Sequence, residues 1–226
     1  MIKLEHTVLP SSEQMQFVIE GMRNPMNSWD KSDSVKCYAN GNCQGICNEN
    51  KIGLCVGDND RRLMQKLSYA GTDHRKFMRM MPVYVRITEP LYWWKEADTY
   101  KIGTVANSCS TMHKIQEKEF TMNDFSIEHL DDDRSAELSN IEWLEYLIHH
   151  LNRDRRRFIE TKDKQYWWQM IQLLPSSYNQ TRNVMLNYEV LFNIYHSRKN
   201  HKLDEWREFC KWIKTLPYSE LITQEG

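Results

Sequence analysis

The sequence predicts a mixed fold of helices packed on a sheet, in the α+β or α/β class, because helical patterns dominate and at least one strand pattern lies among them. Apolar residues spaced three or four positions apart mark amphipathic helices that begin near residues 11, 58, 141 and 204. In residues 82–89, Val83, Val85 and Ile87 alternate with other side chains, as in a strand with one buried face. The 226 residues are enough to bury a core, so we expect a single domain over residues 1–226.

The two helices expected before residue 72 have recognisable start and stop signals. Ser11 and Gln14 form a capping box at the start of the first helix. Either Asp58 or Asp60 is expected to cap the second helix, and Gly71 to end it, because glycine accepts the left-handed conformation that commonly follows a helix.

A cysteine-rich segment, residues 36–57, separates these helices. It contains Cys37, Cys43, Cys47 and Cys55, with five, three and seven residues between successive cysteines. Four thiolates could bind zinc, but structural zinc sites usually pair their ligands more tightly than these spacings allow. We therefore predict no metal site and favour reduced thiols, while a zinc site stays the alternative.

The central stretch combines a strand, a helix start and a polar loop. Pro90 follows the strand and suits the first turn of a helix over residues 91–100, where its missing N–H costs nothing. Residues 103–111 are rich in small hydroxyl and amide side chains. Such a loop can present donors to an anion or a planar ring, although an ordinary polar connection has the same composition.

Helices are expected through most of the remaining chain. One begins at residue 141 and ends in the basic run 153–157, and another carries the pair Trp167-Trp168. A third is predicted from Thr181 through Arg198, and the last over residues 204–214.

Charge and hydropathy argue against two classes of partner. Thirty basic and 31 acidic residues give a net charge of −1, which offers no general attraction to nucleic acid or to an anionic membrane. No stretch is apolar enough to span a bilayer. We expect a cytoplasmic protein that binds neither.

Several short motifs follow one another in a familiar order. Residues 60–64 (DRRLM) precede His74, the strand leads to Glu89-Pro90, and Asn107 and Ser110 lie beyond the polar loop. In the C-terminal half, Leu174-Pro175 is followed by Asn187, Asn193 and Arg198. This order resembles the flavin-dependent thymidylate synthases, the ThyX family, from about residue 60 to residue 210.

The family's signature motif, Arg-His-Arg-x-x-Ser-x-Asn-Glu-x-Ser-x-Arg, is only half kept. Asn107 and Ser110 match it, while Lys101 and Thr104 are milder replacements. Met112 stands where the family has a substrate-binding arginine, and Glu189 where it has a basic residue. Losing the arginine removes a fork of donors, so the resemblance leaves the nucleotide's phosphate without its usual partner.

The resemblance implies an enzyme that transfers a one-carbon unit from methylene-tetrahydrofolate to C5 of dUMP, with FAD as cofactor and NADPH as reductant. It implies flavin contacts for His74, Lys101, Asn107, Asn187 and Asn193, and nucleotide contacts for Ser110, the one catalytic candidate, and Arg198. Lys101 would offer its charge to a phosphate. The resemblance also implies a homotetramer, in which the tryptophan-rich helices are candidate interfaces.

Two alternatives stay open. A flavin enzyme could act on a different pyrimidine nucleotide, because the first half of the motif is altered. A non-catalytic oligomeric binding protein could also use this fold, since fold alone does not define function.

Overall fold

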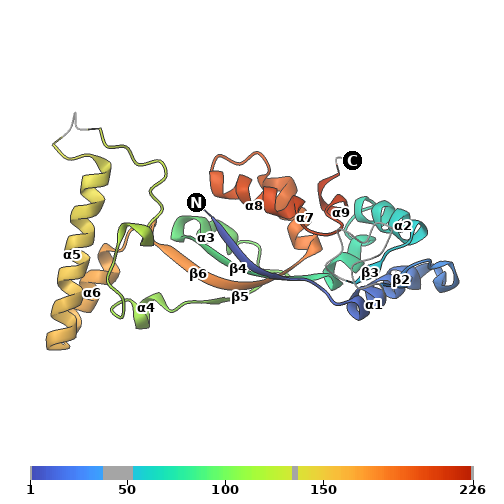
Figure 1. Cartoon of the computed structure of the whole chain (residues 1–226), viewed down its shortest axis with the longest axis horizontal. Coiled ribbons are helices and arrows are strands. Elements are labelled where there is room, and N and C mark those ends of the chain that lie inside the picture. The colour runs from blue at the N-terminus through green and yellow to red at the C-terminus, as the bar shows by residue number, and fades with distance from the viewer. Residues whose placement is uncertain (1, 38–52, 134–136, 225–226) are drawn as a thin grey trace. The chain divides into compact units, whose positions relative to one another are not determined.

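The computed structural model describes residues 2–37, 53–133 and 137–224 (Figure 1). The elements follow in this order: β1 Lys3–Val8, α1 Ser12–Arg23, the 3-10 turns η1 Asn24–Met26 and η2 Trp29–Lys31, β2 Val35–Lys36, β3 Leu54–Cys55, α2 Asp58–Tyr69, η4 Arg75–Met80, β4 Pro82–Pro90, α3 Leu91–Ala97, β5 Val105–Ser108, α4 Thr111–Lys114, η5 Met122–Asp124, α5 Asn140–Thr161, α6 Lys164–Leu173, β6 Asn179–Asn187, α7 Tyr188–Arg198, α8 Asp204–Lys214 and α9 Glu220–Thr223. This mixture of helices and sheet confirms the predicted fold class.

The strands form a four-stranded sheet in the order β1-β4-β6-β5 and a short antiparallel ladder of β2 with β3. The chain divides into two compact units. Unit 1 comprises Met1–Lys3, Ile87–Thr99 and Asn107–Arg182, and unit 2 comprises Leu4–Arg86, Tyr100–Ala106 and Asn183–Gly226. Each strand of the larger sheet has residues in both units. A single domain over 1–226 stays a prediction.

In unit 1, α5 and α6 lie side by side as a helical hairpin (Figure 1). A capping box of Ser139 and Glu142 begins α5, and Lys162 ends it in the left-handed conformation. The Asn152 side chain pairs with the backbone N–H and C=O of Phe120, each at 2.8 Å. The hairpin therefore holds the segment before η5 by hydrogen bonds as well as by apolar packing. The buried cluster comprises Ile115, Phe120, Phe125, Leu144, Ile148, Leu151 and Met170.

In unit 2, α7 packs against η4, α8 and α9. Tyr188, in its first turn, is fully buried, and its hydroxyl donates to the backbone oxygen of Pro217. Burial raises the pKa of Tyr188, so this side chain stays neutral and serves as packing and as a donor. The predicted capping box at Ser11 and Gln14 is present at the start of α1.

The helix predicted from Thr181 is wrong in its first third. Residues Asn179–Asn187 form β6, and the helix begins only at Tyr188. Val184 and Leu186 are buried and alternate with less buried neighbours, which is the period of a strand. Asn187 ends the strand and caps α7, because its side chain accepts from the N–H of Val190 at 2.9 Å.

The central stretch also differs from the prediction. Strand β4 continues to Pro90, which serves as the N-cap residue of α3, and this helix ends at Ala97 instead of residue 100. Part of the predicted loop forms strand β5, whose four residues are all exposed. Its apolar residue Val105 faces outward, so the segment carried no buried pattern from which a strand could be predicted.

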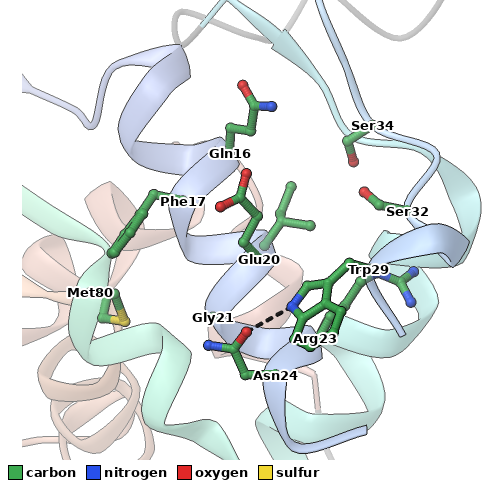
Figure 2. Close-up of a pocket in the computed structure, with 11 residues that line it drawn as sticks. Gln16, Phe17, Glu20, Gly21, Arg23, Asn24, Trp29, Ser32, Ser34 and Met80 are labelled. Atoms are coloured by element: carbon green, nitrogen blue, oxygen red, sulfur yellow. Dashed lines mark hydrogen bonds between the residues drawn. The ribbon is translucent and has the colours of Figure 1, made fainter. Parts of the chain in front are cut away.

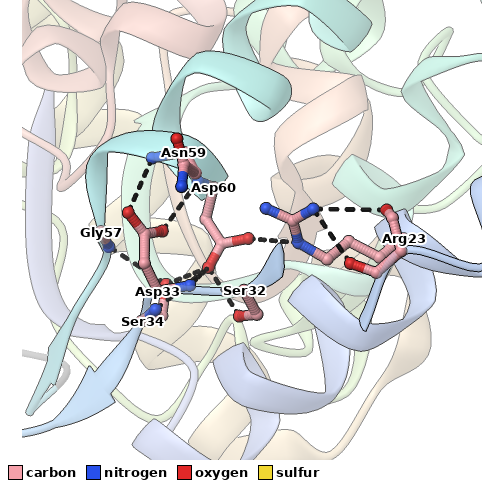
Figure 3. A network of polar contacts seen from close by, with 8 residues as sticks. Arg23, Ser32, Asp33, Ser34, Gly57, Asn59 and Asp60 are labelled. Carbon is pink, nitrogen blue, oxygen red and sulfur yellow. Dashed lines mark hydrogen bonds and ion pairs between the residues drawn. The ribbon is translucent and has the colours of Figure 1, made fainter. Parts of the chain in front are cut away.

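The expected cap of α2 is wrong as well. Gly57 occupies the N-cap position, and the carboxylate of Asp33 accepts from the N–H of Asn59 at 2.9 Å and of Asp60 at 3.1 Å (Figure 3). A side chain at Gly57 would collide with Asp33, since its Cβ would lie 2.2 Å from the Asp33 Cγ atom. A residue distant in sequence thus supplies the cap, which leaves Asp60 for a different partner.

Cys43 and Cys47 lie outside the described residues. Cys55 is disulfide-bonded, which corrects the expectation of reduced thiols at that position. In residues 2–37, 53–133 and 137–224, no group of three or more His, Cys, Asp or Glu side chains is placed to hold a metal ion. None of the helices in those ranges is long and apolar enough to cross a bilayer.

Candidate functional site

Helix α7 carries the candidates Asn193 and Arg198, and a third, Asn187, is its N-cap residue. The helix contacts the degenerate motif at both of its ends. At its start, Asn187 is 7% exposed, and its Nδ2 atom donates to the backbone oxygen of Gly103 at 3.5 Å. Gly103 has a φ of 81°, and a Cβ there would lie 2.6 Å from that Nδ2 atom. Only glycine fits this close approach without strain, so residues 100–106 are held against the start of α7.

At the other end of α7, Arg198 lies among aromatic and polar side chains of the same unit. Its Nε donates to the hydroxyl of Tyr100 at 3.0 Å, and its Nη1 donates to Nε2 of His201 at 2.9 Å. The guanidinium lies 5.0 Å from the ring centroid of Trp206 and 5.8 Å from that of Tyr100. Arg198 is therefore oriented by cation–π contacts and by hydrogen bonds.

The acidic residue Glu189, which departs from the family pattern, has a cationic partner. Its carboxylate pairs with Nε of Arg79 and accepts from Nη2 of the same residue at 3.1 Å. This hydrogen bond and the charge of Glu189 raise the pKa of Arg79. The basic charge that is absent at position 189 is thus present on its partner Arg79, in η4.

Three candidates project into solvent. His74, Lys101 and Asn193 are exposed, and their side chains make no hydrogen bond or ion pair with the described residues. Close to two of them in sequence, Nε of Arg75 and Oγ1 of Thr104 are buried without a hydrogen-bond partner in that same part of the chain. Exposed and orphaned donors on these segments leave unit 2 able to bind a polar ligand.

The remaining two candidates belong to unit 1. Asn107 is exposed on β5, and the hydroxyl of Ser110 accepts from the N–H of His113 at 3.2 Å as the cap of α4. The same loop is tied to β6, because Cys109 N–H donates to the oxygen of Thr181 at 2.9 Å and Gln180 donates to Thr111 at 2.9 Å. Ser110 is thus placed by a backbone contact of Cys109 on one side and a side-chain contact of Thr111 on the other.

Sequence reasoning missed Arg79, His201 and Trp206. Arg79 lies 110 residues before its partner Glu189, so no spacing rule could connect them. His201 and Trp206 follow α7 closely, but nothing in their pattern distinguished a contact with Arg198 from ordinary packing.

The chain is similar in fold to known protein structures. No family model and no curated protein matches it. Among solved structures, the chain is similar to ThyX from Helicobacter pylori with FAD and dUMP. The match covers 99% of this chain and 97% of that chain, with 15% sequence identity and a TM-score of 0.64. This likeness shows a fold of the flavin-dependent thymidylate synthase type.

A second solved relative has a different printed activity. The UMP/dUMP methylase PolB from Streptomyces cacaoi, bound with 5-Br dUMP, matches 97% of this chain and 92% of its own, with 11% identity and a TM-score of 0.58. A further structure of H. pylori ThyX with FAD and dUMP has 16% identity, a TM-score of 0.62, and coverages of 98% and 97%. The fold resemblance inferred from the motifs is confirmed over nearly the whole chain.

Proposed function

We propose that the chain is a flavin-dependent methyltransferase of a pyrimidine nucleotide, with dUMP as substrate. The observation that carries the proposal is the attachment of residues 100–106 to both ends of α7, at Gly103 and at Tyr100. These two segments hold most of the candidates, and they meet in a chain whose fold is that of ThyX.

The residues present fit a flavin nucleotide by their donor chemistry. The exposed donors of His74, Lys101 and Asn193 would hold it, with Asn107 as a further amide contact. The orphaned Oγ1 of Thr104 would gain a partner, which removes the cost of its desolvation. Asn187 would act mainly by fixing the loop, because both ends of its amide are already bonded.

When bound, FAD supplies the redox chemistry of the one-carbon transfer, with NADPH as reductant and methylene-tetrahydrofolate as the donor. Arg198 would bind an anionic group of the nucleotide with its guanidinium charge. Ser110 would orient the pyrimidine with its hydroxyl, which can donate while its oxygen caps α4. These groups act by binding and orientation, which fixes the reacting partners in place. We further propose that the protein is a cytoplasmic homotetramer.

The first experiment is an absorbance spectrum of the purified protein before and after FAD is added and unbound FAD is removed by desalting. We expect a retained flavin spectrum. A matched variant, Lys101→Ala, should retain less, whereas Lys95→Ala, on the exposed surface of α3, should retain as much as the unchanged protein. A colourless protein after FAD addition would contradict the proposal and favour a non-catalytic binding protein.

A second candidate function is the methylation of another pyrimidine nucleotide. Met112 is 45% exposed and offers no charge where the family has a substrate-binding arginine, and one structural relative is a UMP/dUMP methylase. Turnover on a panel of uracil and cytosine nucleotides separates the two. Activity restricted to dUMP would eliminate this candidate.

A further inference from the structure

A pocket of about 640 Å³ lies in unit 2, away from the candidate residues of the proposed site, none of which lines it. One wall is α1, and the facing wall is the segment of η1 and η2 that continues to Ser34 (Figure 2). Its volume lies within the range of cavities that bind small molecules.

The polar groups of α1 that line the pocket share one helical face. Gln16, Glu20 and Arg23 are four and three residues apart, so their side chains follow one another along the helix. Figure 2 shows the Glu20 side chain on α1 next to Gln16. Its exposed carboxylate makes no hydrogen bond or ion pair within residues 2–37, 53–133 and 137–224.

Arg23 is the fixed donor of the pocket. It is 3% exposed, and its Nε pairs with Asp60 at 2.6 Å while its Nη1 donates to the backbone oxygen of Ser28 at 3.2 Å. Figure 3 shows the guanidinium held from both sides. Its Nη2 has no hydrogen-bond partner among the residues that the structure describes. A buried guanidinium so oriented, with one amino group to spare, is prearranged to bind an acceptor.

Two exposed aromatic rings complete the lining. Phe17 is 62% exposed and Trp29 is 50% exposed. The indole Nε1 of Trp29 donates to Oδ1 of Asn24 at 2.7 Å, which fixes the orientation of the ring. Exposed aromatic faces of this kind favour stacking with a flat ligand.

We propose that this pocket binds a planar heterocycle with a 2-amino-4-oxopyrimidine edge, the edge that guanine and pterins share. The carboxylate of Glu20 would accept the ring N–H and the neighbouring amino group, as ionised carboxylates accept paired donors. Nη2 of Arg23 would donate to the carbonyl oxygen of the same edge. Trp29 or Phe17 would stack on the ring.

The test is calorimetric titration of the full chain, without flavin, with guanosine, inosine and pterin as probes. Inosine lacks the amino group, so guanosine or pterin should bind at least tenfold more tightly than inosine. Glu20→Gln should weaken guanosine or pterin binding at least tenfold, and Phe17→Ala should weaken it less. Glu13→Gln, on the same helix but outside the pocket lining, should leave it unchanged.

The outcomes are distinguishable from those of the proposed function, because no arm uses flavin or turnover. Binding of pterin alone would identify a folate-type ligand, and binding of guanosine alone a purine nucleotide. Glu20→Gln should melt at the same temperature as the unchanged protein, because its carboxylate has no partner to lose among the residues that the structure describes. Equal affinity for guanosine and inosine, binding unchanged by Glu20→Gln, or no binding of guanosine and pterin at millimolar concentration would each overturn the proposal.

Discussion

Unit 2 contains two polar regions that differ in how far their hydrogen bonds are satisfied. The fully buried carboxylate of Asp60 accepts from Arg23, from the hydroxyls of Ser32 and Ser34, and from two backbone N–H groups (Figure 3). In contrast, Lys101 and Ile102 are exposed, Ile102 by 94%, and the buried hydroxyl of Thr104 has no partner in the described part of the chain. We call the first region the support and the second the proposed binding surface, since binding groups must keep hydrogen-bonding capacity for a ligand.

The largest expected effect tests the support. Asp60→Asn should lower the free energy of unfolding by about 3–5 kcal/mol, because it leaves the guanidinium of Arg23 buried without its counter-charge. Urea denaturation measures this loss. Asp58→Asn, an exposed residue on the same helix, is the control and should change stability little. Equal effects of the two substitutions would show that the buried Asp60 contributes no more to stability than an exposed aspartate of the same helix.

The same carboxylate should make stability depend on pH. Burial alone would raise the pKa of Asp60, but hydrogen bonds from Ser34, Ser32 and Arg23, with the charge of Arg23, outweigh it and lower that pKa. Because the folded-state pKa lies below the unfolded value, the stabilisation is complete above the ordinary aspartate range and is lost as pH falls through the folded pKa. Unfolding measured between neutral and acid pH should show this loss in the unchanged protein and much less of it in Asp60→Asn.

Substitutions in the proposed binding surface should change the affinity for the nucleotide much more than the free energy of unfolding. Arg198→Ala should weaken dUMP binding about tenfold or more, since hydrogen bonds to charged groups contribute roughly 1.5–3 kcal/mol. Calorimetry measures the affinity, and Lys202→Ala, a nearby exposed cation, should leave it unchanged. If Arg198→Ala bound dUMP normally, its assignment to the nucleotide would be wrong.

A pair of glycine substitutions separates contact from backbone strain. Gly103→Ala should cost about 1–2 kcal/mol of unfolding free energy, from its left-handed backbone and from the clash with Asn187. Gly71→Ala introduces only backbone strain and no clash, because its φ is 111° and no atom lies within 4 Å of the added Cβ. Urea denaturation should therefore rank Gly103→Ala as the more damaging. The reverse order would show that Asn187 does not restrain this loop.

The smallest expected effect concerns the pair of Arg79 and Glu189. The side chain of Arg79 is about half exposed, so solvent screens the interaction. A double-mutant cycle with Arg79→Gln and Glu189→Gln should give a coupling of about 1 kcal/mol or less in unfolding free energy. A much larger coupling would place this pair with the buried support.

Local signals in the sequence predicted the local features well. The capping box at Ser11 and the alternation of Val83, Val85 and Ile87 depend on neighbours in the chain, and both are present. The strand before α7 was missed because its polar half, residues 179–183, has no apolar alternation of its own. The pairing of Arg23 with Asp60 joins residues 37 positions apart, and no periodicity encodes such a contact.

In the candidate site, too, short motifs predicted some features, whereas contacts between distant segments were missed. Short motifs predicted the fold that the solved relatives share, and they pointed to Asn187 and Arg198 by their spacing. They could not predict that Asn187 restrains Gly103, or that Glu189 has Arg79 as its partner, because both contacts depend on how distant segments fold together.

Because Tyr100 and Gly103 are bonded to opposite ends of α7, the length of this helix and the length of the loop depend on each other. Eleven residues at about 1.5 Å each separate its ends by roughly 16 Å, a distance that residues 100–103 span only together with the long side chains of Tyr100 and Arg198. One residue inserted into α7 would turn Arg198 by about 100° and remove it from Tyr100, while Asn187 kept its place. Insertions and deletions within α7 should therefore be tolerated only when the loop changes in length at the same time.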